Sequence, residues 1–172
     1  MSVTLYQLPG PWKGCLAIAS RPRGGDWLAD DLKALGEAGV DVLLSTLTAN
    51  ERVELGLTEE EELARRSGLE YVSFPIDDRG VPASVPAAAE LVARIRSRLN
   101  GGETVAIHCR SGIGRSSLLA AAMLAASGVD WNLAFQRIET ARGLSVPDTP
   151  EQKEWVRSFL GEAVSKPERA AS

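Results

Sequence analysis

The chain has 172 residues, of which 44% are hydrophobic and 24% charged, and its net charge is -4. This length suits a single domain with its own core, and the composition is that of an ordinary globular protein. The acidic balance argues against a generally basic, nucleic-acid-coating surface, so any bound anion must be held locally. Two cysteines and one histidine cannot supply a four-ligand zinc site, and no apolar run approaches the ~20 residues of a membrane helix.

Short apolar strands alternate with amphipathic helices along the chain. The expected strands are 16–19, 40–45, 71–74 and 104–108, and the expected helices are 26–38, 58–68, 84–99, 115–126, 131–141 and 150–160. This alternation predicts a three-layer α/β/α domain with a small, mainly parallel central sheet. We expect one domain over residues 1–160, followed by a flexible tail over residues 161–172.

Capping signals mark two of the expected helix starts. The segment 58–61, Thr-Glu-Glu-Glu, has the pattern of a capping box. The acidic run 59–62 is therefore interpreted as a solvated first turn, whose charge suits the helix dipole. Ser84 is placed to cap the helix 84–99, and Pro86 is tolerated in its first turn.

The segment after the expected strand 104–108 has the features of an anion site. Cys109 follows that strand directly, and five residues separate it from Arg115. At a junction between a parallel strand and a helix, loop amides are free to bind an anion. Gly112 and Gly114 allow a positive φ and a close approach to a tetrahedral anion. The helix start and Arg115 favour the thiolate form of Cys109, and the arginine offers a planar fork for two phosphoryl oxygens.

The segment 108–116, His-Cys-x5-Arg-Ser, resembles the signature loop of the cysteine-dependent protein tyrosine and dual-specificity phosphatases. The segment 74–82 resembles the general-acid loop of the kinase-associated phosphatase branch. The segments 141–143 and 146–152 resemble the C-terminal helix region of that branch. The resemblance covers about residues 14–159, and the three pieces in order are more specific than the cysteine motif alone.

The resemblance implies a phosphatase that works through a cysteinyl-phosphate intermediate on Cys109, with no cofactor and no metal. Arg115 would clamp the phosphate, and Asp78 would act first as general acid and then as base. Ser116 would help the thiolate to leave when the phosphoenzyme is hydrolysed. The phosphate-binding loop would be lined by Arg110, Ser111, Gly112, Ile113 and Gly114, together with Arg115.

Two adjacent carboxylates compete for the role of general acid. Side chains alternate along an extended segment, so we expect only one of Asp77 and Asp78 to face the cysteine loop. The related pattern Pro-Ile-x-Asp-x-Gly-x-Pro aligns with residues 75–82 and assigns the acid to Asp78. A turn in this loop could direct Asp77 inward instead.

Three supporting residues have two readings each. His108 would order the loop backbone rather than act directly in catalysis. Gln152 would either position the hydrolytic water or, as part of the pattern Thr-Pro-Glu-Gln at 149–152, only cap a helix. Arg142 would support the wall of the site or cap the end of its helix.

The expected substrate is a phosphorylated protein, carrying phosphotyrosine and as a further candidate phosphoserine or phosphothreonine. One alternative is an inositol phosphate or phosphoinositide, although the loop contains Arg110 and no lysine. The other is a phosphate-binding adaptor without turnover, and a sulfur-transfer enzyme would not need Asp78. The first residues lack the features of a signal peptide, so we expect a cytoplasmic protein without membrane or nucleic-acid partners. Cys15 is expected to pack in a strand, with redox pairing to Cys109 left open.

Overall fold

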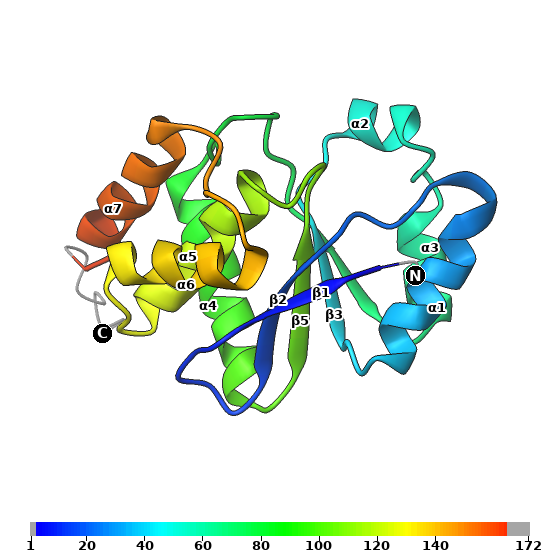
Figure 1. The fold of residues 1–172 in the computed structure, drawn as a ribbon, viewed down its shortest axis with the longest axis horizontal. Helices are drawn as coiled ribbons and strands as arrows, with labels where there is room; N and C mark the ends of the chain where they lie inside the picture. Colours follow the sequence, from blue (N-terminus) through cyan, green and yellow to red (C-terminus); the bar gives the residue numbers. More distant parts are fainter. Residues whose placement is uncertain (1–2, 165–172) are drawn as a thin grey trace, which may run out of the picture.

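A computed structural model describes residues 3–164, which form a five-stranded sheet between two layers of helices (Figure 1). The strands are β1 (Leu5–Leu8), β2 (Cys15–Ala19), β3 (Val42–Ser45), β4 (Glu70–Ser73) and β5 (Thr104–His108). They lie in the order β1-β2-β5-β3-β4, and all neighbours are parallel except β1, which pairs antiparallel with β2. The predicted three-layer α/β/α fold with a mainly parallel sheet is confirmed.

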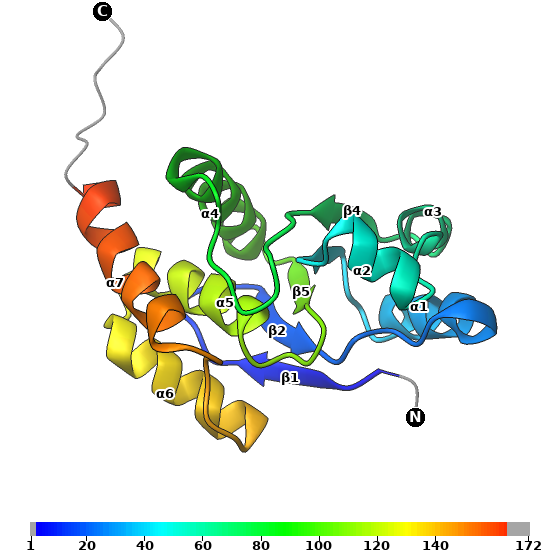
Figure 2. The ribbon, with the colours of Figure 1, turned by 90° about the horizontal axis from the view of Figure 1, so that it is seen from above.

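Helices cover both faces of the sheet, as Figure 2 shows from above. One face is covered by α1 (Leu28–Glu37), α2 (Ala49–Glu54) and α3 (Glu60–Arg66), and the other by α4 (Val85–Asn100), α5 (Arg115–Ala126), α6 (Trp131–Arg142) and α7 (Pro150–Val164). The helix α5 is the innermost of the second layer, and it contacts α4, α6, α7 and the sheet. Its residues are apolar on nearly all sides because they are buried on nearly all sides.

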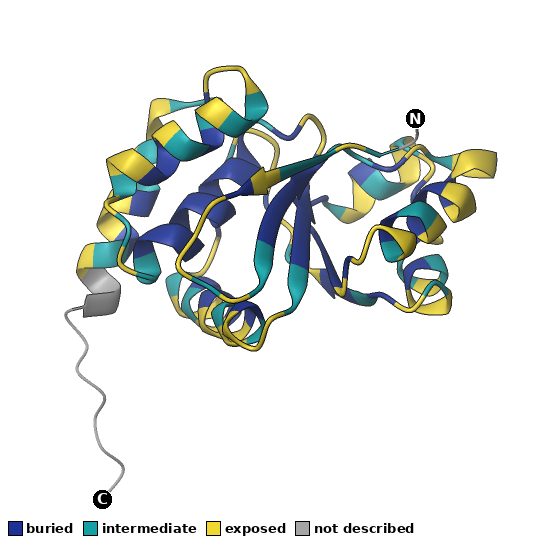
Figure 3. Cartoon of the chain, turned by 60° about the horizontal axis from the view of Figure 1, so that its bottom comes forward, coloured by how far each residue is buried: buried dark blue, intermediate teal, exposed yellow. Residues whose placement is uncertain are grey.

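The alternation of side chains along the strands divides the core in two. On β5, Val105 and Ile107 join the cluster under α4–α7, whereas Ala106 joins the cluster under α1 and α3. On β3, Leu44 joins the cluster under α4–α7 and Leu43 joins the cluster under α1 and α3. The strands are therefore buried on both faces through the middle of the molecule (Figure 3).

Two elements are absent from the sequence-based prediction. The edge strand β1 is short, and the helix α2 has only six residues. The prediction of a capping box at 58–61 is wrong, because α3 begins at Glu60 and its N-cap makes no side-chain bond. The cap at Ser84 is confirmed, since its hydroxyl oxygen accepts the N–H of Ala87 at 3.2 Å.

The C-terminal helix is longer than predicted. It continues to Val164, past the expected start of the tail at Gly161, and residues 165–172 lie outside the described part of the chain. Within residues 3–164, no helix has the length and apolar character needed to cross a bilayer.

Candidate active site

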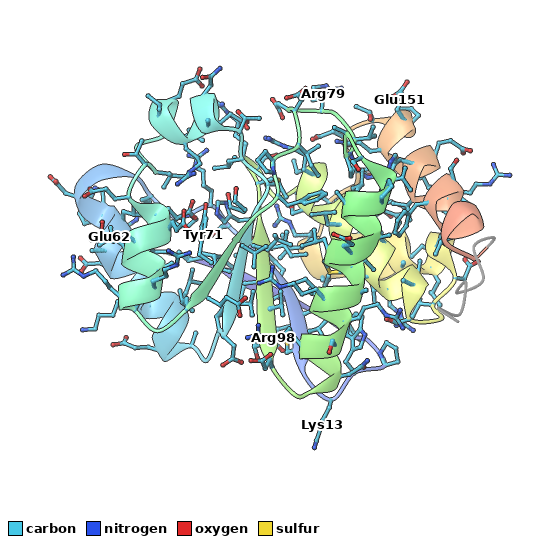
Figure 4. All side chains as sticks on the ribbon, turned by 180° about the vertical axis from the view of Figure 1, so that it is seen from behind. Lys13, Glu62, Tyr71, Arg79, Arg98 and Glu151 are labelled. Carbon is cyan, nitrogen blue, oxygen red and sulfur yellow. The ribbon has the colours of Figure 1, made fainter. Side chains whose placement is uncertain are left out.

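The loops that carry the predicted site residues meet at one end of the sheet, where the parallel strands have their C-terminal ends. The parallel strands β3, β4 and β5 all end there, so the segments that follow them are neighbours. The segment after β4 is anchored to the end of β3, because the N–H of Ile76 donates to Thr46 O at 3.0 Å. In Figure 4, the labelled Arg79 and Glu151 lie at this end, and Lys13 lies at the opposite one.

Cys109 lies at the bottom of the loop between β5 and α5, with 2% of its surface exposed. Its Sγ accepts the N–H of Gly112 at 3.2 Å and lies 3.2 Å from the hydroxyl oxygen of Ser116. Gly112 has a φ of 71°, which turns its amide toward the sulfur. Hydrogen-bond donors directed at a sulfur at the start of a helix stabilise negative charge there.

Arg115 is the first residue of α5, and its side chain is 1% exposed. Both terminal nitrogens of its guanidinium are hydrogen-bonded within the protein. Its two terminal nitrogens donate to the carboxylate of Glu51 at 2.7 and 2.8 Å. Nη1 also donates to Ile76 O at 2.9 Å, and Nη2 to Asp78 Oδ1 at 3.2 Å. Burial lowers the pKa of Arg115, but the bonds to Glu51 and the nearby negative charges of Cys109, Glu51 and Asp78 together outweigh burial, so the pKa is raised overall. Burial likewise raises the pKa of Glu51, but the bonds and charge of Arg115, together with the hydrogen bonds from Thr48, outweigh burial and lower the pKa of Glu51 overall.

His108 is fully buried on the opposite face of β5 from the apolar residues under α5. Its Nε2 lies 2.5 Å from the carboxylate of Glu60, and its Nδ1 lies 3.3 Å from Cys109 O. Glu60 also accepts the hydroxyl of Tyr71 at 3.3 Å. Burial, with the nearby charge of Glu60, raises the pKa of Tyr71 to about 12. These contacts join the start of the phosphate loop to α3 and β4.

Glu60 corrects the interpretation of the acidic run 59–62 as a solvated turn. Its side chain is 0% exposed, whereas that of Glu62 is 72% exposed. Figure 4 shows Tyr71 pointing inward between β4 and α3 and Glu62 pointing outward. The helix starts two residues later than predicted, and one acid of the run faces the sheet.

The two neighbouring aspartates differ in their surroundings. Asp78 reaches Arg115, although 57% of its side chain is exposed. The carbonyl oxygen of Asp77 accepts the N–H of Gly80 at 2.8 Å, which closes a turn at Arg79, whose φ is 61°. Within residues 3–164, no bond joins the side chain of Asp77 to the phosphate loop. The turn thus directs Asp78 toward Arg115.

The outer wall of the phosphate loop is held by two arginines. Arg142 donates from Nε to Gly112 O at 3.0 Å and from Nη2 to Ser111 O at 3.2 Å, and its guanidinium lies 4.1 Å from the ring centre of Tyr6. Of its two readings, support of the wall is the one observed, because α6 ends in a left-handed Gly143. Arg21 donates to the carbonyl oxygen of Arg110 at 3.3 Å.

Gln152 lies in the first turn of α7 and is fully buried. It exchanges two bonds with Thr149, each of 3.2 Å, so the capping box is observed. Its Nε2 also donates to Gly80 O at 3.0 Å. The side chain therefore ties α7 to the loop that carries Asp78.

The comparison with protein families identifies the chain. Residues 17–129 match the family described as polymorphic toxin system, DSP-PTPase phosphatase. The chain belongs to this family. The predicted relationship to cysteine-dependent protein tyrosine and dual-specificity phosphatases is confirmed.

Individual relatives of this chain are distant in sequence. A protein of Invertebrate iridescent virus 6 named as a tyrosine phosphatase, 197R, is 25% identical over 160 residues, which are 91% of this chain and 56% of that protein. The chain thus spans about half the length of the curated relative it matches.

Solved structures share the fold of this chain. Kinase-associated phosphatase with its catalytic cysteine replaced by serine has a TM-score of 0.89 and 19% identity, covering 97% of this chain and 99% of that one. PTPMT1 in complex with PI(5)P has a TM-score of 0.73 and 18% identity, covering 96% and 98%. The active form of Tk-PTP has a TM-score of 0.70 and 24% identity, covering 86% and 91%.

The second cysteine of the chain, Cys15, is far from Cys109. Cys15 begins β2 opposite Thr104, whereas Cys109 follows the end of β5. Five residues of strand separate the two levels by roughly 16 Å, and a disulfide needs Cα atoms within about 7 Å. Redox pairing of the two thiols is therefore incompatible with this fold. Burial raises the pKa of Cys15, as expected for a packed thiol.

The sequence analysis missed three acids at the candidate site, Glu51, Glu60 and Asp148. A signal for Glu51 was present, because Thr48 and Glu51 form a capping box at the start of α2. No local pattern distinguishes Glu60 from its acidic neighbours. Asp148 lies against the loop at Gly114. In the described part of the chain, no group of three or more His, Cys, Asp or Glu side chains is placed to hold a metal ion.

Proposed function

We propose that this chain is a protein-tyrosine or dual-specificity phosphatase that hydrolyses phosphomonoesters through a cysteinyl-phosphate on Cys109. The observation that carries the proposal is the convergence of Cys109, Arg115 and Asp78 from two loops that are 31 or more residues apart in the chain. The sulfur and the guanidinium flank the same helix start, where loop amides can bind phosphoryl oxygens. Residues 1–160 would form the phosphatase domain.

In the first half-reaction, the Cys109 thiolate attacks phosphorus, and the S–P bond forms as the bond to the leaving oxygen breaks. Arg115 and the loop amides stabilise the charge on the equatorial oxygens. The loop residues that supply these contacts are Arg110, Ser111, Gly112, Ile113 and Gly114. Asp78, protonated at this stage, gives its proton to the leaving oxygen.

In the second half-reaction, water attacks the cysteinyl-phosphate and the S–P bond breaks. Asp78, now a carboxylate, takes a proton from the water. Ser116 stabilises the departing thiolate through its hydroxyl, which lies 3.2 Å from the sulfur. His108 and Glu51 act indirectly, because each positions a loop group rather than touching the substrate.

We infer a phosphorylated protein as the substrate, with phosphotyrosine first. The family is described as a DSP-PTPase phosphatase family and the viral relative as a tyrosine phosphatase, and both descriptions support the inference. PI(5)P in the PTPMT1 complex is a property of that protein, and it makes inositol phosphates a comparison substrate for the experiment. A reducing compartment such as the cytoplasm suits a nucleophile that must remain a free thiolate.

The test measures release of inorganic phosphate from a panel of phosphotyrosine, phosphoserine and phosphothreonine peptides and of inositol phosphates, with a chelator present. We expect turnover of the phosphotyrosine peptides, inhibition by vanadate and no need for a divalent metal. Faster turnover of an inositol phosphate than of every peptide would assign the alternative substrate. Tight phosphopeptide binding without any turnover would assign the adaptor function.

A further inference from the structure

Asp148 lies between α6 and α7 and approaches the phosphate loop at Gly114. A Cβ atom added to Gly114 would lie 2.3 Å from Asp148 Oδ2 and 2.9 Å from Gln152 Nε2. Gly114 is buried and directly precedes Arg115. Because glycine has no side chain, the carboxylate of Asp148 can lie against the backbone of the loop at this position.

The carboxylate lies where the two loops of the site meet. Gln152, beside it, donates from Nε2 to Gly80 O at 3.0 Å, two residues after Asp78. Asp78 in turn reaches Arg115 at 3.2 Å. Asp148 is thus next to the phosphate loop on one side and, through Gln152, next to the acid loop on the other.

In the proposed mechanism, the side from which water attacks is fixed by the geometry of phosphoryl transfer. In phosphoryl transfer, the attacking and leaving oxygens are roughly in line with phosphorus. Water that hydrolyses a phosphate on Cys109 must therefore enter opposite the sulfur, on the side that the leaving group vacates. Under the proposed function, Asp78 serves both that leaving group and that water, which puts the water near the acid loop, and Gln152 ties this loop to the junction beside Asp148.

Of the two polar side chains at this junction, Asp148 has the greater free capacity. The amide of Gln152 is occupied at both ends, by the N–H of Thr149 and by Gly80 O. Asp148 is half-buried, and within residues 3–164 its carboxylate has no hydrogen bond or ion pair. A carboxylate offers about four acceptor sites, so it can accept a hydrogen bond from water.

We propose that Asp148 is a catalytic residue of the second half-reaction, in which it orients the attacking water; this inference rests on the proposed function. The oxygen of the water forms a bond to phosphorus, and the S–P bond breaks with its electron pair on the Cys109 sulfur. One proton of the water passes to the Asp78 carboxylate. The other O–H donates a hydrogen bond to Asp148, and the products are inorganic phosphate and the thiolate.

Asp148 also precedes the start of α7, where a negative charge favours the helix without any role in catalysis. The two roles differ in what they affect. A helix-stabilising carboxylate affects the free energy of unfolding, whereas a water-orienting carboxylate affects only the breakdown of the phosphoenzyme. Glu151, exposed in the first turn of α7, provides the matched control, because Glu151→Gln removes the same charge without touching Gly114.

The experiment compares the wild-type chain with Asp148→Asn, Asp148→Ala and Glu151→Gln in rapid mixing with p-nitrophenyl phosphate. The burst of p-nitrophenol measures formation of the phosphoenzyme, and the decay of acid-trapped phosphoenzyme measures its hydrolysis. For both Asp148 variants, we expect formation within about twofold of the wild type and hydrolysis slower by about 10- to 100-fold, the cost of a misplaced reactant. Glu151→Gln should match the wild type in both steps.

Unchanged formation of the phosphoenzyme would also prove that each variant is folded. The inference is overturned if the Asp148 variants hydrolyse the phosphoenzyme at the wild-type rate, or if both steps slow equally. Failure of the wild type to form any phosphoenzyme would overturn the proposed function and this inference with it. If the wild type forms and hydrolyses the phosphoenzyme and the Asp148 variants hydrolyse it at the same rate, only this inference is overturned.

Discussion

The two loops that form the site are held in different ways. The phosphate loop, residues 109–114, is buried at its base and bonded to its surroundings from several sides, including two bonds from Arg142. The acid loop, residues 74–83, is anchored at its start to the end of β3, where the N–H of Ile76 donates to Thr46 O. Beyond Ile76 it is joined to its neighbours through Arg115 and Gln152, and Asp78 is left 57% exposed. The phosphate loop, which is the proposed anion cradle, is therefore formed in advance, whereas the proposed proton donor, Asp78, is held by few contacts.

This difference matches the tasks of the two loops. Convergent amides stabilise developing charge only if they need no reorganisation when the reaction occurs. In the proposed mechanism, the carboxyl of Asp78 serves two partners in turn, a leaving oxygen and then a water, and an exposed position allows both. Changes in the cradle should therefore affect every substrate alike, and changes in the acid loop should depend on the leaving group.

The largest effect should come from the nucleophile of the cradle. Cys109→Ser should lower turnover by about 10⁴-fold or more, because a hydroxyl is not ionised at neutral pH. The thermal midpoint should stay close to that of the wild type. The control Cys15→Ser changes the thiol at the other end of the sheet and should keep full activity. Substantial turnover by Cys109→Ser would contradict the assignment of the nucleophile.

The acid loop is tested by its two aspartates. Asp78→Asn should lower kcat by about 10²–10⁴-fold for alkyl phosphates, which need a proton on the leaving oxygen, and far less for activated aryl phosphates. Asp77→Asn should have a small effect that is the same for all substrates. The measurement is kcat against leaving-group pKa for both variants. The opposite pattern would exchange the roles of the two carboxylates.

Arg115, the proposed phosphate clamp, should not be replaceable by lysine. Arg115→Lys should lower kcat by about 10²–10³-fold, because a point charge cannot reproduce the planar fork that holds two oxygens. Unlike the effect of Asp78→Asn, this loss should be independent of the leaving group. Near-normal rates in Arg115→Lys would show that the loop amides bind the phosphate without the fork.

The buried support of the cradle should appear mainly in stability. Glu60→Gln should lower the free energy of unfolding by about 3 kcal/mol, because it breaks a pair that is 0% exposed on both sides. For a protein of this size that is a drop of about 6–12 °C in the melting midpoint. Glu62→Gln, on the exposed side of α3, should leave the midpoint unchanged. Equal midpoints for the two variants would contradict the structural role of Glu60.

The smallest effect should be the pH dependence that Glu51 contributes. Arg115 lowers the pKa of Glu51 in the folded chain, so this carboxylate stabilises the fold above its unfolded pKa of about 4.3. That contribution is lost as the pH falls through the lowered folded-state pKa. Melting midpoints between pH 7 and pH 3 should therefore fall less steeply in Glu51→Gln than in the wild type. Parallel curves would show that Glu51 does not titrate with folding.

The sequence alone predicted most of the second layer and the central strands. The bounds of β5 and α5 are as predicted, because an apolar strand, a glycine-rich turn and an apolar helix follow one another without ambiguity. The edge strand β1 escaped prediction because its four residues carry no strong alternation. The helix α2 escaped because a six-residue helix has too few turns to show a periodic apolar face.

The sequence by itself determined the family and the order of the proposed reacting groups, because Cys109, Arg115 and Ser116 are positioned by one short loop whose spacing is visible in the chain. Only the tertiary structure decided what holds that loop. Glu51 and Glu60 lie 64 and 48 residues from their partners, and a helix start shifted by two residues changes which acid faces the sheet. Short-range geometry follows from local sequence, whereas the burial of a charge depends on which distant side chain meets it.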